Sequence, residues 1–409
     1  MEKEINLEDI NLKIKFYEDQ IRSSVEALSL NTIPIEKLIY LAPTMSPGPS
    51  SIYKEYIEDP ITTSKWMFEN VSNDSNVVLN FQEKKMGSRC TWLAQKSKSE
   101  KKWNITSWSR NGYNIFKNTE YKNEIYSKLQ YFLNKIEYKL GKTNLILLDS
   151  EILPWNFLSE NFIDKQFMNV FNSGYLSAKN IYNSILKYKK FSEDNKISID
   201  EELLKKEEKY LNVLDNFKEC KEIIENYCWK INSSNDIKIS FFDILAYGDK
   251  IGHEIFNTQE ETIRFLNFIS SDFDFCDLIK NMIIYNNEKS LQVGFDWWKM
   301  LTNNKSEGVV IKYNDKKIES NNKFPQKMLK CRGQKYLKII YGENYLQENI
   351  LKRIKSHRNI KYKMEAAWKE NLLSNLALKN YLSGKKFYEW HKYIIFSLAS
   401  EFIEIDSRL

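Results

Sequence analysis

The sequence predicts an α+β fold: a core of antiparallel sheets with an inserted helical module and a helical C-terminal module. Two observations lead to this prediction. Short runs of apolar and β-branched residues, typical of strands, recur before residue 156 and again between residues 236 and 342. Apolar residues at helical spacing dominate residues 157–235 and 343–409 instead. A chain of 409 residues is long enough for two or three such modules.

The expected elements follow in order along the chain. The first forty residues have apolar side chains at helical spacing, which predicts one or two helices ending near Pro34. A loop rich in Pro, Gly and Ser follows at residues 43–49. Strands are predicted at 77–81, 90–93, 144–148, 237–242, 308–312 and 336–341. The predicted domains are a helical leader at 1–34, a core at 35–156 and 236–342, a helical insert at 157–235 and a helical module at 343–409.

Composition excludes several classes of protein. No stretch approaches the roughly eighteen uninterrupted apolar residues of a membrane span, and no apolar segment follows the charged N-terminus. A cytoplasmic protein that does not bind membranes is therefore expected. The five cysteines are scattered and have only three histidines beside them, so neither a zinc site nor a disulfide framework is expected. The histidines His253, His357 and His391 are expected either at the surface or in the core with their hydrogen-bonding groups paired.

The distribution of charge is more informative than its sum. The net charge is +6, whereas residues 327–363 hold eleven Lys or Arg and two acids, a local excess of +9. This segment is either a phosphate-binding face or a solvated helix surface, and composition leaves both interpretations open.

A short motif, KxxGxR, lies between two predicted strands at residues 84–89. The motif places Lys84 at a strand end, but a pattern this short also occurs by chance. Four further segments follow it in order, and their sequences are DSE at 149–151, FFDIL at 241–245, EGVVIK at 307–312 and LKCR at 329–332. The joint occurrence of five segments in this order is far more specific than the first motif alone.

In this order the segments resemble the nucleotidyltransferase motifs of polynucleotide ligases and messenger RNA capping enzymes. Residues 40–47, 83–89, 148–155 and 330–342 look like the C-terminal ligase domain of bacterial polynucleotide kinase-phosphatase, and the likeness runs from about residue 35 to 409. The resemblance implies a nucleotidyltransferase, ATP-grasp-like ligase core. Because the chain begins at its own methionine with a short leader, it resembles the stand-alone ligase subunit of a split RNA repair complex. A kinase-phosphatase and an RNA 3'-terminal 2'-O-methyltransferase are then the expected partner subunits of a hetero-oligomer.

The resemblance implies an ATP-dependent RNA ligase. Lys84 would attack ATP to form lysyl-AMP, and AMP would pass to an RNA 5'-phosphate that is then sealed to a 3'-OH. Lys85 is a rival nucleophile, but the motif counts three positions back from Gly87 and so selects Lys84. A cluster of cations would favour the neutral amine and offset phosphate charge. The expected members of this cluster are Arg89, Lys312, Lys330 and Arg332.

The same resemblance assigns the nucleotide and metal ligands. Mg²⁺ or Mn²⁺ would need oxygen ligands, and Glu151 and Glu307 would serve the metal or the ribose, with help from Asp149. Phe242 would stack on adenine. The nucleotide would also contact Lys84, Arg89, Lys312 and Lys330.

Several residues keep two interpretations. Arg110 either contacts phosphate or the RNA end, or it is an exposed arginine in a β-turn. Arg332 is also expected to contact the RNA. Trp297 and Trp298 are expected in the core or the wall of the pocket. Residues 44–46 form a lid over the nucleotide or a structural loop.

Three rival functions come from two classes. A DNA ligase and a capping-type nucleotidyltransferase normally carry an OB-fold after the last lysine motif, whereas the helical pattern of residues 343–409 favours an RNA ligase. A nonenzymatic RNA-binding or scaffold subunit would retain the fold without its chemistry. The presence of all five key residues argues against it: Lys84, Glu151, Glu307, Lys330 and Arg332.

Overall fold

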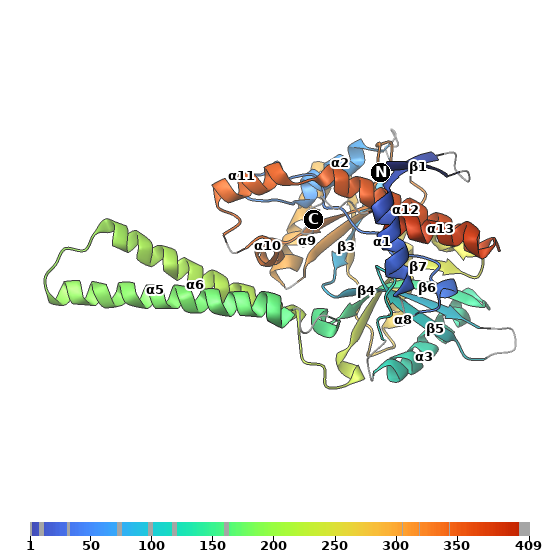
Figure 1. Cartoon of the computed structure of the whole chain (residues 1–409), viewed down its shortest axis with the longest axis horizontal. Coiled ribbons are helices and arrows are strands. Elements are labelled where there is room, and N and C mark those ends of the chain that lie inside the picture. The colour runs from blue at the N-terminus through green and yellow to red at the C-terminus, as the bar shows by residue number, and fades with distance from the viewer. Residues whose placement is uncertain are drawn as a thin grey trace.

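The computed structural model describes residues 2–7, 12–30, 33–71, 76–96, 101–116, 121–158, 163–304, 306–318, 320–342 and 344–400. It confirms the α+β class: two antiparallel sheets form a body that helices cover, and a long helical hairpin projects from that body (Figure 1). The domain boundaries drawn from the sequence remain a prediction.

The two sheets meet at the KxxGxR motif. One sheet has four strands in the order β11 (Met328–Arg332), β10 (Gly308–Tyr313), β3 (Val78–Lys84) and β9 (Asn281–Tyr285). The other has five in the order β5 (Asn104–Ser109), β4 (Ser88–Gln95), β6 (Leu145–Leu153), β7 (Lys238–Tyr247) and β8 (Lys250–Ile251). Only residues 85–87 separate β3 from β4. The motif is therefore the point at which the chain crosses from one sheet to the other.

Successive side chains of a strand point to opposite faces of the sheet, and helices pack on the faces that carry apolar side chains. Helices α2 (Pro60–Glu69) and α9 (Glu288–Asn303) pack on the four-stranded sheet, and α3 (Lys122–Leu140) and α8 (Gln259–Ser270) pack on one face of the five-stranded sheet. The other face of that sheet packs against α1 (Glu18–Ser29), α12 (Ile360–Leu382) and α13 (Phe387–Leu398). The C-terminal helices thus lie against the core sheet that carries Arg89.

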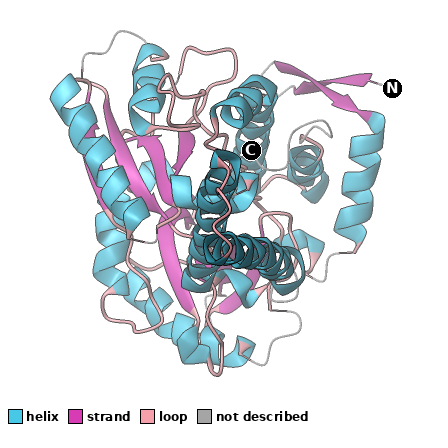
Figure 2. Cartoon of the chain, turned by 90° about the vertical axis from the view of Figure 1, so that its left-hand side faces the viewer, coloured by secondary structure: helices cyan, strands magenta, loops and turns pink. Residues whose placement is uncertain are grey.

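The inserted hairpin consists of α5 (Asn169–Asp194) and α6 (Glu201–Tyr227), preceded by a π-helix at Ile163–Met168. Figure 1 shows it reaching away from the body, and Figure 2 looks along it, with its two helices in front of the strands. An apolar cluster at its base includes Phe171, Ile224 and Met86. The insert therefore packs directly against the motif loop through Met86.

Two predicted elements were wrong. Residues 2–7 and 12–17 form two paired antiparallel strands, β1 (Glu2–Leu7) and β2 (Leu12–Tyr17), not a helix, and only α1 matches the predicted helical leader. In β2 the alternation of buried Ile14 and Phe16 with exposed Lys13 and Lys15 has the period of a strand.

The predicted strand at 336–341 is instead helix α10 (Gln334–Tyr341), which ends at Gly342 with φ +97°. A short apolar run does not distinguish a strand from a helix by periodicity alone. Strands β5, β9 and β11 were not predicted. Helices are present in both predicted helical regions, where α11 (Glu348–His357) precedes α12, and residues 401–409 lie outside the described chain.

Candidate active site

Lys84 is the last residue of β3 and lies opposite Gly308, the first residue of β10. Its Nζ lies 2.5 Å from Oε2 of Glu307, whose side chain is almost completely buried. Gly87 lets the loop at residues 85–87 pass close to β6, since a Cβ at this position would lie 2.2 Å from the carbonyl oxygen of Ile152. The strand pairing and the glycine together fix Lys84 at the junction of the two sheets.

The neighbouring Lys85 is held in two ion pairs. Its Nζ lies 3.0 Å from Glu83 Oε2 and 2.9 Å from Asp277 Oδ2. Burial alone would lower the pKa of Lys85, but the two carboxylates outweigh it and raise that pKa. Lys85 is therefore kept protonated, and a protonated amine is not a nucleophile. This geometry favours Lys84 over its rival.

Two further lysines face the same junction from β10 and β11. Burial, with Arg89 and Lys316 nearby, lowers the pKa of Lys312 to about 8. Burial also lowers the pKa of Lys330 well below its ordinary value, and the positive charges of Arg332 and Lys84 add to this effect. Crowded cations in a dry site are a preformed binding place for phosphate oxygens.

The carboxylates from β6 differ in how they are engaged. Asp149 accepts two hydrogen bonds from the Arg89 guanidinium, at 2.6 Å from Nε to Oδ1 and a second from Nη2 to Oδ2. The side chain of Glu151 makes no hydrogen bond to the described part of the chain, and it lines a small cavity of about 30 Å³ together with Lys84. Burial, with Glu307 and Asp149 close by, raises the pKa of Glu151 to about 7, although Lys84 and Arg89 oppose this shift.

These donors fit a hard cation that binds together with its nucleotide. Among the described residues, no three His, Cys, Asp or Glu side chains gather into a ready-made metal site. Mg²⁺ commonly takes one or two carboxylates and completes its shell with waters and substrate phosphates. Glu151 and Glu307 fit this role, whereas both oxygens of Asp149 are already bound by Arg89.

Phe242 on β7 forms the apolar side of the pocket. Its ring packs against Ile263 and Ile279 and is 7% exposed. The Arg89 guanidinium lies over the ring, 4.5 Å from its centroid, and Lys312 Nζ lies 5.7 Å from the same point. A base can stack on this side of Phe242 only after Arg89 has moved aside.

Arg332 lies in the interior of the protein. Its guanidinium is 3% exposed and forms a bidentate ion pair with Glu58, with Nη2 2.5 Å from Oε1. Arg358 reaches the same carboxylate at 3.1 Å. Although burial opposes the charged carboxylate, the two arginines hold the pKa of Glu58 at about 2. In this arrangement Glu58 holds the Arg332 guanidinium, and the contact of Arg332 with RNA stays a prediction.

Arg110 lies in the turn after β5, away from Lys84. Its Nη1 is 3.9 Å from Glu370 Oε2, and its side chain is 34% exposed. The same Glu370 oxygen accepts a hydrogen bond of 2.5 Å from the backbone N–H of Thr44. Arg110 therefore remains a candidate for a contact with the RNA beyond the pocket.

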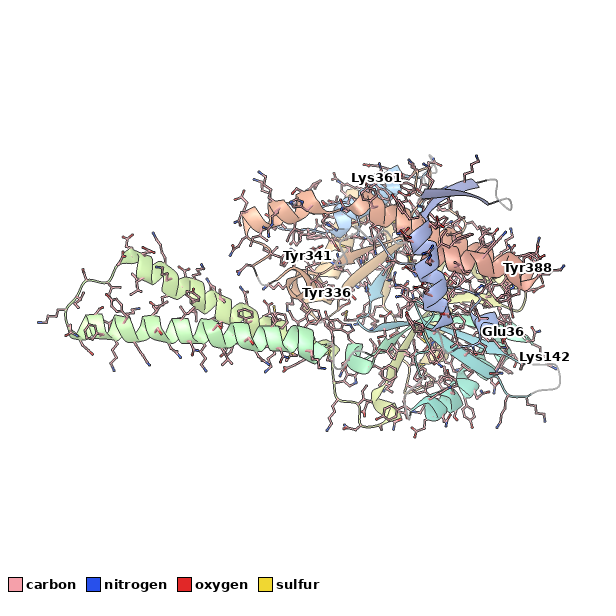
Figure 3. All side chains as sticks on the ribbon, viewed as in Figure 1. Glu36, Lys142, Tyr336, Tyr341, Lys361 and Tyr388 are labelled. Carbon is pink, nitrogen blue, oxygen red and sulfur yellow. The ribbon has the colours of Figure 1, made fainter. Side chains whose placement is uncertain are left out.

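The basic segment 327–363 is neither a single phosphate-binding face nor a solvated surface. Arg332 and Arg358 share Glu58, Lys338 pairs with Glu219, and Lys363 is buried. Lys361 is exposed at the edge of the body (Figure 3). Of the eleven cations, Arg332 and Lys363 are buried, Lys352, Arg353 and Lys361 are exposed, and the others are partly buried.

The loop at 43–49 pairs with an edge of the sheet. Lys330 N–H donates to the carbonyl of Ser46 at 2.9 Å, and Gly48 N–H donates to the carbonyl of Lys330 at 3.2 Å. This pairing supports the structural interpretation of the loop over the lid. Trp298 is a core residue, and Trp297 packs beside it. His391 is buried and stacks on Phe387, and burial lowers its pKa.

Sequence reasoning missed the residues that hold these groups in place. They are Glu58, Glu83, Asp243, Asp277 and Lys316. Asp243 directly follows Phe242 in the sequence, so its position next to a predicted site residue could have identified it. In the structure, Lys316 Nζ lies 2.9 Å from its Oδ1. No local sequence pattern identifies Glu58, because its partner Arg332 lies 274 positions away in the sequence.

Comparison with known proteins agrees with this geometry. Residues 23–403 match the family described as the PNKP adenylyltransferase domain, ligase domain. The chain belongs to this family. The matched range includes the KxxGxR segment at the sheet junction, residues 84–89.

Two solved structures share the fold of this PNKP ligase family member. A structure of a Pnkp1/Rnl/Hen1 complex aligns with a TM-score of 0.66 at 20% identity, covering 95% of this chain and 98% of that chain. A structure of the Pnkp1/Rnl/Hen1 RNA repair complex aligns with a TM-score of 0.63 at 19% identity, covering 95% and 99%. No curated protein matches the sequence. None of the described helices is long and apolar enough to span a membrane.

Proposed function

We propose that this chain is an ATP-dependent RNA ligase that acts through a lysyl-AMP intermediate on Lys84. The observation that carries the proposal is the contrast between two adjacent lysines. Both lysines line the pocket, but two carboxylates, Glu83 and Asp277, hold the Lys85 ammonium, whereas among the described residues Lys84 pairs with Glu307 alone. Family membership agrees with this chemistry, since the matching family is an adenylyltransferase.

In the first step, the Lys84 amine attacks the α-phosphorus of ATP. A nitrogen–phosphorus bond forms, the bond to the β-phosphate oxygen breaks, pyrophosphate leaves and the amine loses a proton. Glu307 is the closest acceptor for that proton, at 2.5 Å from Nζ. Lys312 and Lys330 would bind the phosphate oxygens as charge develops on them.

Mg²⁺, or Mn²⁺ in its place, would offset phosphate charge and orient the triphosphate when bound. Glu151 and Glu307 are the residues that would hold it, and Glu151 must lose its proton to do so. Asp149 would act indirectly, by orienting Arg89 toward the ribose or the α-phosphate. Phe242 would carry the adenine once Arg89 has turned away from its ring.

In the later steps, an oxygen of the RNA 5'-phosphate attacks the AMP phosphorus and releases the Lys84 amine. A 3'-OH then attacks the activated 5'-phosphorus and displaces AMP. Both structural neighbours are Pnkp1/Rnl/Hen1 complexes, one of them described as an RNA repair complex, which supports partner subunits for this chain. We expect a kinase-phosphatase and an RNA 3'-terminal 2'-O-methyltransferase to supply healed and marked RNA ends in the cytoplasm.

The proposal is tested by incubating the purified protein with Mg²⁺ and α-labelled ATP or α-labelled GTP, followed by a denaturing gel. Covalent label from ATP alone, chased onto a 5'-phosphorylated RNA when the partners are added, is the expected result. Folded protein that takes no label from either nucleotide would contradict the proposal and favour a nonenzymatic scaffold.

A further inference from the structure

We call the small cavity lined by Lys84, Lys85 and Glu151 the lysine pocket. A second and larger cavity, which we call the α12 cavity, lies next to it. Its volume is about 340 Å³, compared with about 30 Å³ for the lysine pocket. Arg89, Phe242, Lys312 and Met328 line both cavities and form a shared wall. The opposite wall comes from helix α12 and includes Asn371, Asn375 and Lys379. The cavity thus opens between the core sheets and the C-terminal helices.

The α12 cavity is suited to a second ligand beside the nucleotide that reacts with Lys84. Neither Lys84 nor Glu307 lines it, so the attacked phosphorus must lie on the other side of the shared wall. Its volume falls within the range of roughly 300–1,000 Å³ that is usual for small-ligand pockets. One nucleotide of a nucleic acid strand is a ligand of this size.

The charges of the cavity favour an anion. Among the described residues that line it, five are cations and three are acids, an excess of two positive charges. Four of these groups form two pairs, Arg89 with Asp149 and Lys316 with Asp243. The lining also includes the cations Lys312 and Lys379, the acid Asp315, and Lys327, whose Nζ donates a hydrogen bond to the carbonyl of Ile318.

Lys312 carries this argument furthest. Its side chain is 7% exposed, no ion pair holds it in the described part of the chain, and it faces both cavities. The carboxylates of Asp243 and Asp149 favour its charged form from beyond ion-pair distance, and a phosphate at this position would supply a direct counter-charge for the buried cation.

Apolar side chains complete the cavity. Phe242, Tyr40, Leu372 and Leu376 lie on its walls, beside the cations described above. A flat aromatic or aliphatic surface next to cations is the usual environment for a single-stranded nucleotide, whose base packs on the surface while its phosphate meets the charge.

We propose that the α12 cavity binds the 5'-terminal nucleotide of the RNA strand, with its 5'-phosphate held at the shared wall by Lys312 and Arg89. This inference rests on the proposed ligase function and names the place of its second substrate. The 5'-phosphate oxygen would then reach the AMP phosphorus on Lys84 across that wall. The nitrogen–phosphorus bond of Lys84 breaks as the new phosphoanhydride forms, and the lysine recovers its proton. Lys379 on α12 holds the strand from the opposite side.

The test measures RNA binding without ATP, so that its outcome does not depend on adenylylation. A short RNA with a fluorescent label at its 3' end, carrying either a 5'-phosphate or a 5'-OH, is titrated with unmodified protein. The variants are Lys379→Ala and Asn375→Ala, both at exposed positions of α12, and the matched control is Lys361→Ala on the same helix. Self-labelling with ATP is measured on each protein in parallel.

The wild-type protein and Lys361→Ala are expected to bind the 5'-phosphorylated RNA about tenfold more tightly than the 5'-OH RNA. Lys379→Ala is expected to weaken binding of the phosphorylated RNA about tenfold and Asn375→Ala about threefold, with self-labelling within twofold of wild type. A 4-thiouridine at the 5' end should cross-link to residues 242–245 or 371–379.

Three results would overturn the proposal. One is equal binding of the two RNAs by the wild-type protein, and another is cross-linking confined to other segments. The third is a loss of ATP self-labelling in Lys379→Ala, which would assign the cavity to ATP instead. A wild-type protein that never self-labels but shows the expected binding pattern would refute the proposed ligase function and leave the RNA-end cavity standing.

Discussion

Lys84 and Glu307 meet across two antiparallel strands, with Nζ 2.5 Å from Oε2, although 223 positions separate them in the sequence. Replacement of the carboxylate should therefore disable the first chemical step. We expect Glu307→Ala to slow single-turnover self-adenylylation about 100-fold or more, since a charged group at the reacting centre is lost. Glu307→Gln should be intermediate if hydrogen bonding alone orients Lys84. Unchanged rates in both variants would remove Glu307 from the mechanism.

Phe242 should contribute to ATP binding more than to the rate of chemistry. We expect Phe242→Ala to raise the KM for ATP about tenfold with a smaller change in kcat, because base stacking contributes about 1–3 kcal/mol. Phe242→Tyr keeps a ring and should restore the wild-type KM. A KM that stays at the wild-type value in Phe242→Ala would show that adenine lies elsewhere.

Lys312 should make ATP binding depend on pH above neutrality. Its pKa of about 8 means that the side chain is mostly a cation at pH 7 and mostly neutral at pH 9. We therefore expect the KM for ATP to rise between pH 7 and pH 9 in the wild-type protein, in a steady-state labelling assay, since these values lie about one unit on either side of that pKa. Lys312→Arg stays charged over this range and should show a flat profile. A wild-type profile as flat as that of the arginine variant would refute this role.

Glu58 should stabilise the fold rather than the reaction. Its pKa is about 2 in the folded protein and 4.5 without its partners, so its contribution is fully present above pH 4.5 and is lost as pH falls through about 2. We expect Glu58→Gln to lower the free energy of unfolding at pH 7 by about 3 kcal/mol, measured by urea denaturation. The deficit should shrink as pH falls from 4.5 toward 2.

The control for this measurement is Glu36→Gln, at an exposed position (Figure 3), which should change stability by less than about 0.5 kcal/mol. A deficit in Glu58→Gln that does not vary with pH would mean that the ion pair is not its cause.

Local patterns predicted the parts of the fold that depend on nearby residues. The KxxGxR motif and the acidic and basic segments after it gave the residues that meet at the sheet junction, Lys84, Glu151, Glu307, Lys312 and Lys330. The alternation of buried and exposed side chains in β2 is only a few residues long and runs directly into the helix at residues 18–29. The helical spacing of that longer segment therefore dominates the pattern of the leader.

The remaining parts of the site depend on pairings between distant segments. Whether Arg332 faces RNA or the interior is decided by Glu58, 274 positions earlier, and no local pattern reports that carboxylate. Likewise, the role of Lys85 is decided by Asp277, which only the folded chain brings to 2.9 Å from its amine. The cavity between α12 and the core arises in the same way, from the packing of helices against a sheet.

The most direct test of the account compares two adjacent lysines. Wild-type, Lys84→Ala and Lys85→Ala proteins are incubated with Mg²⁺ and α-labelled ATP, and the labelled peptide is mapped by mass spectrometry. We predict AMP on Lys84 in the wild-type protein, no label in Lys84→Ala, and label retained in Lys85→Ala. Label that persists in Lys84→Ala, or that is lost only in Lys85→Ala, would contradict the assignment of the nucleophile.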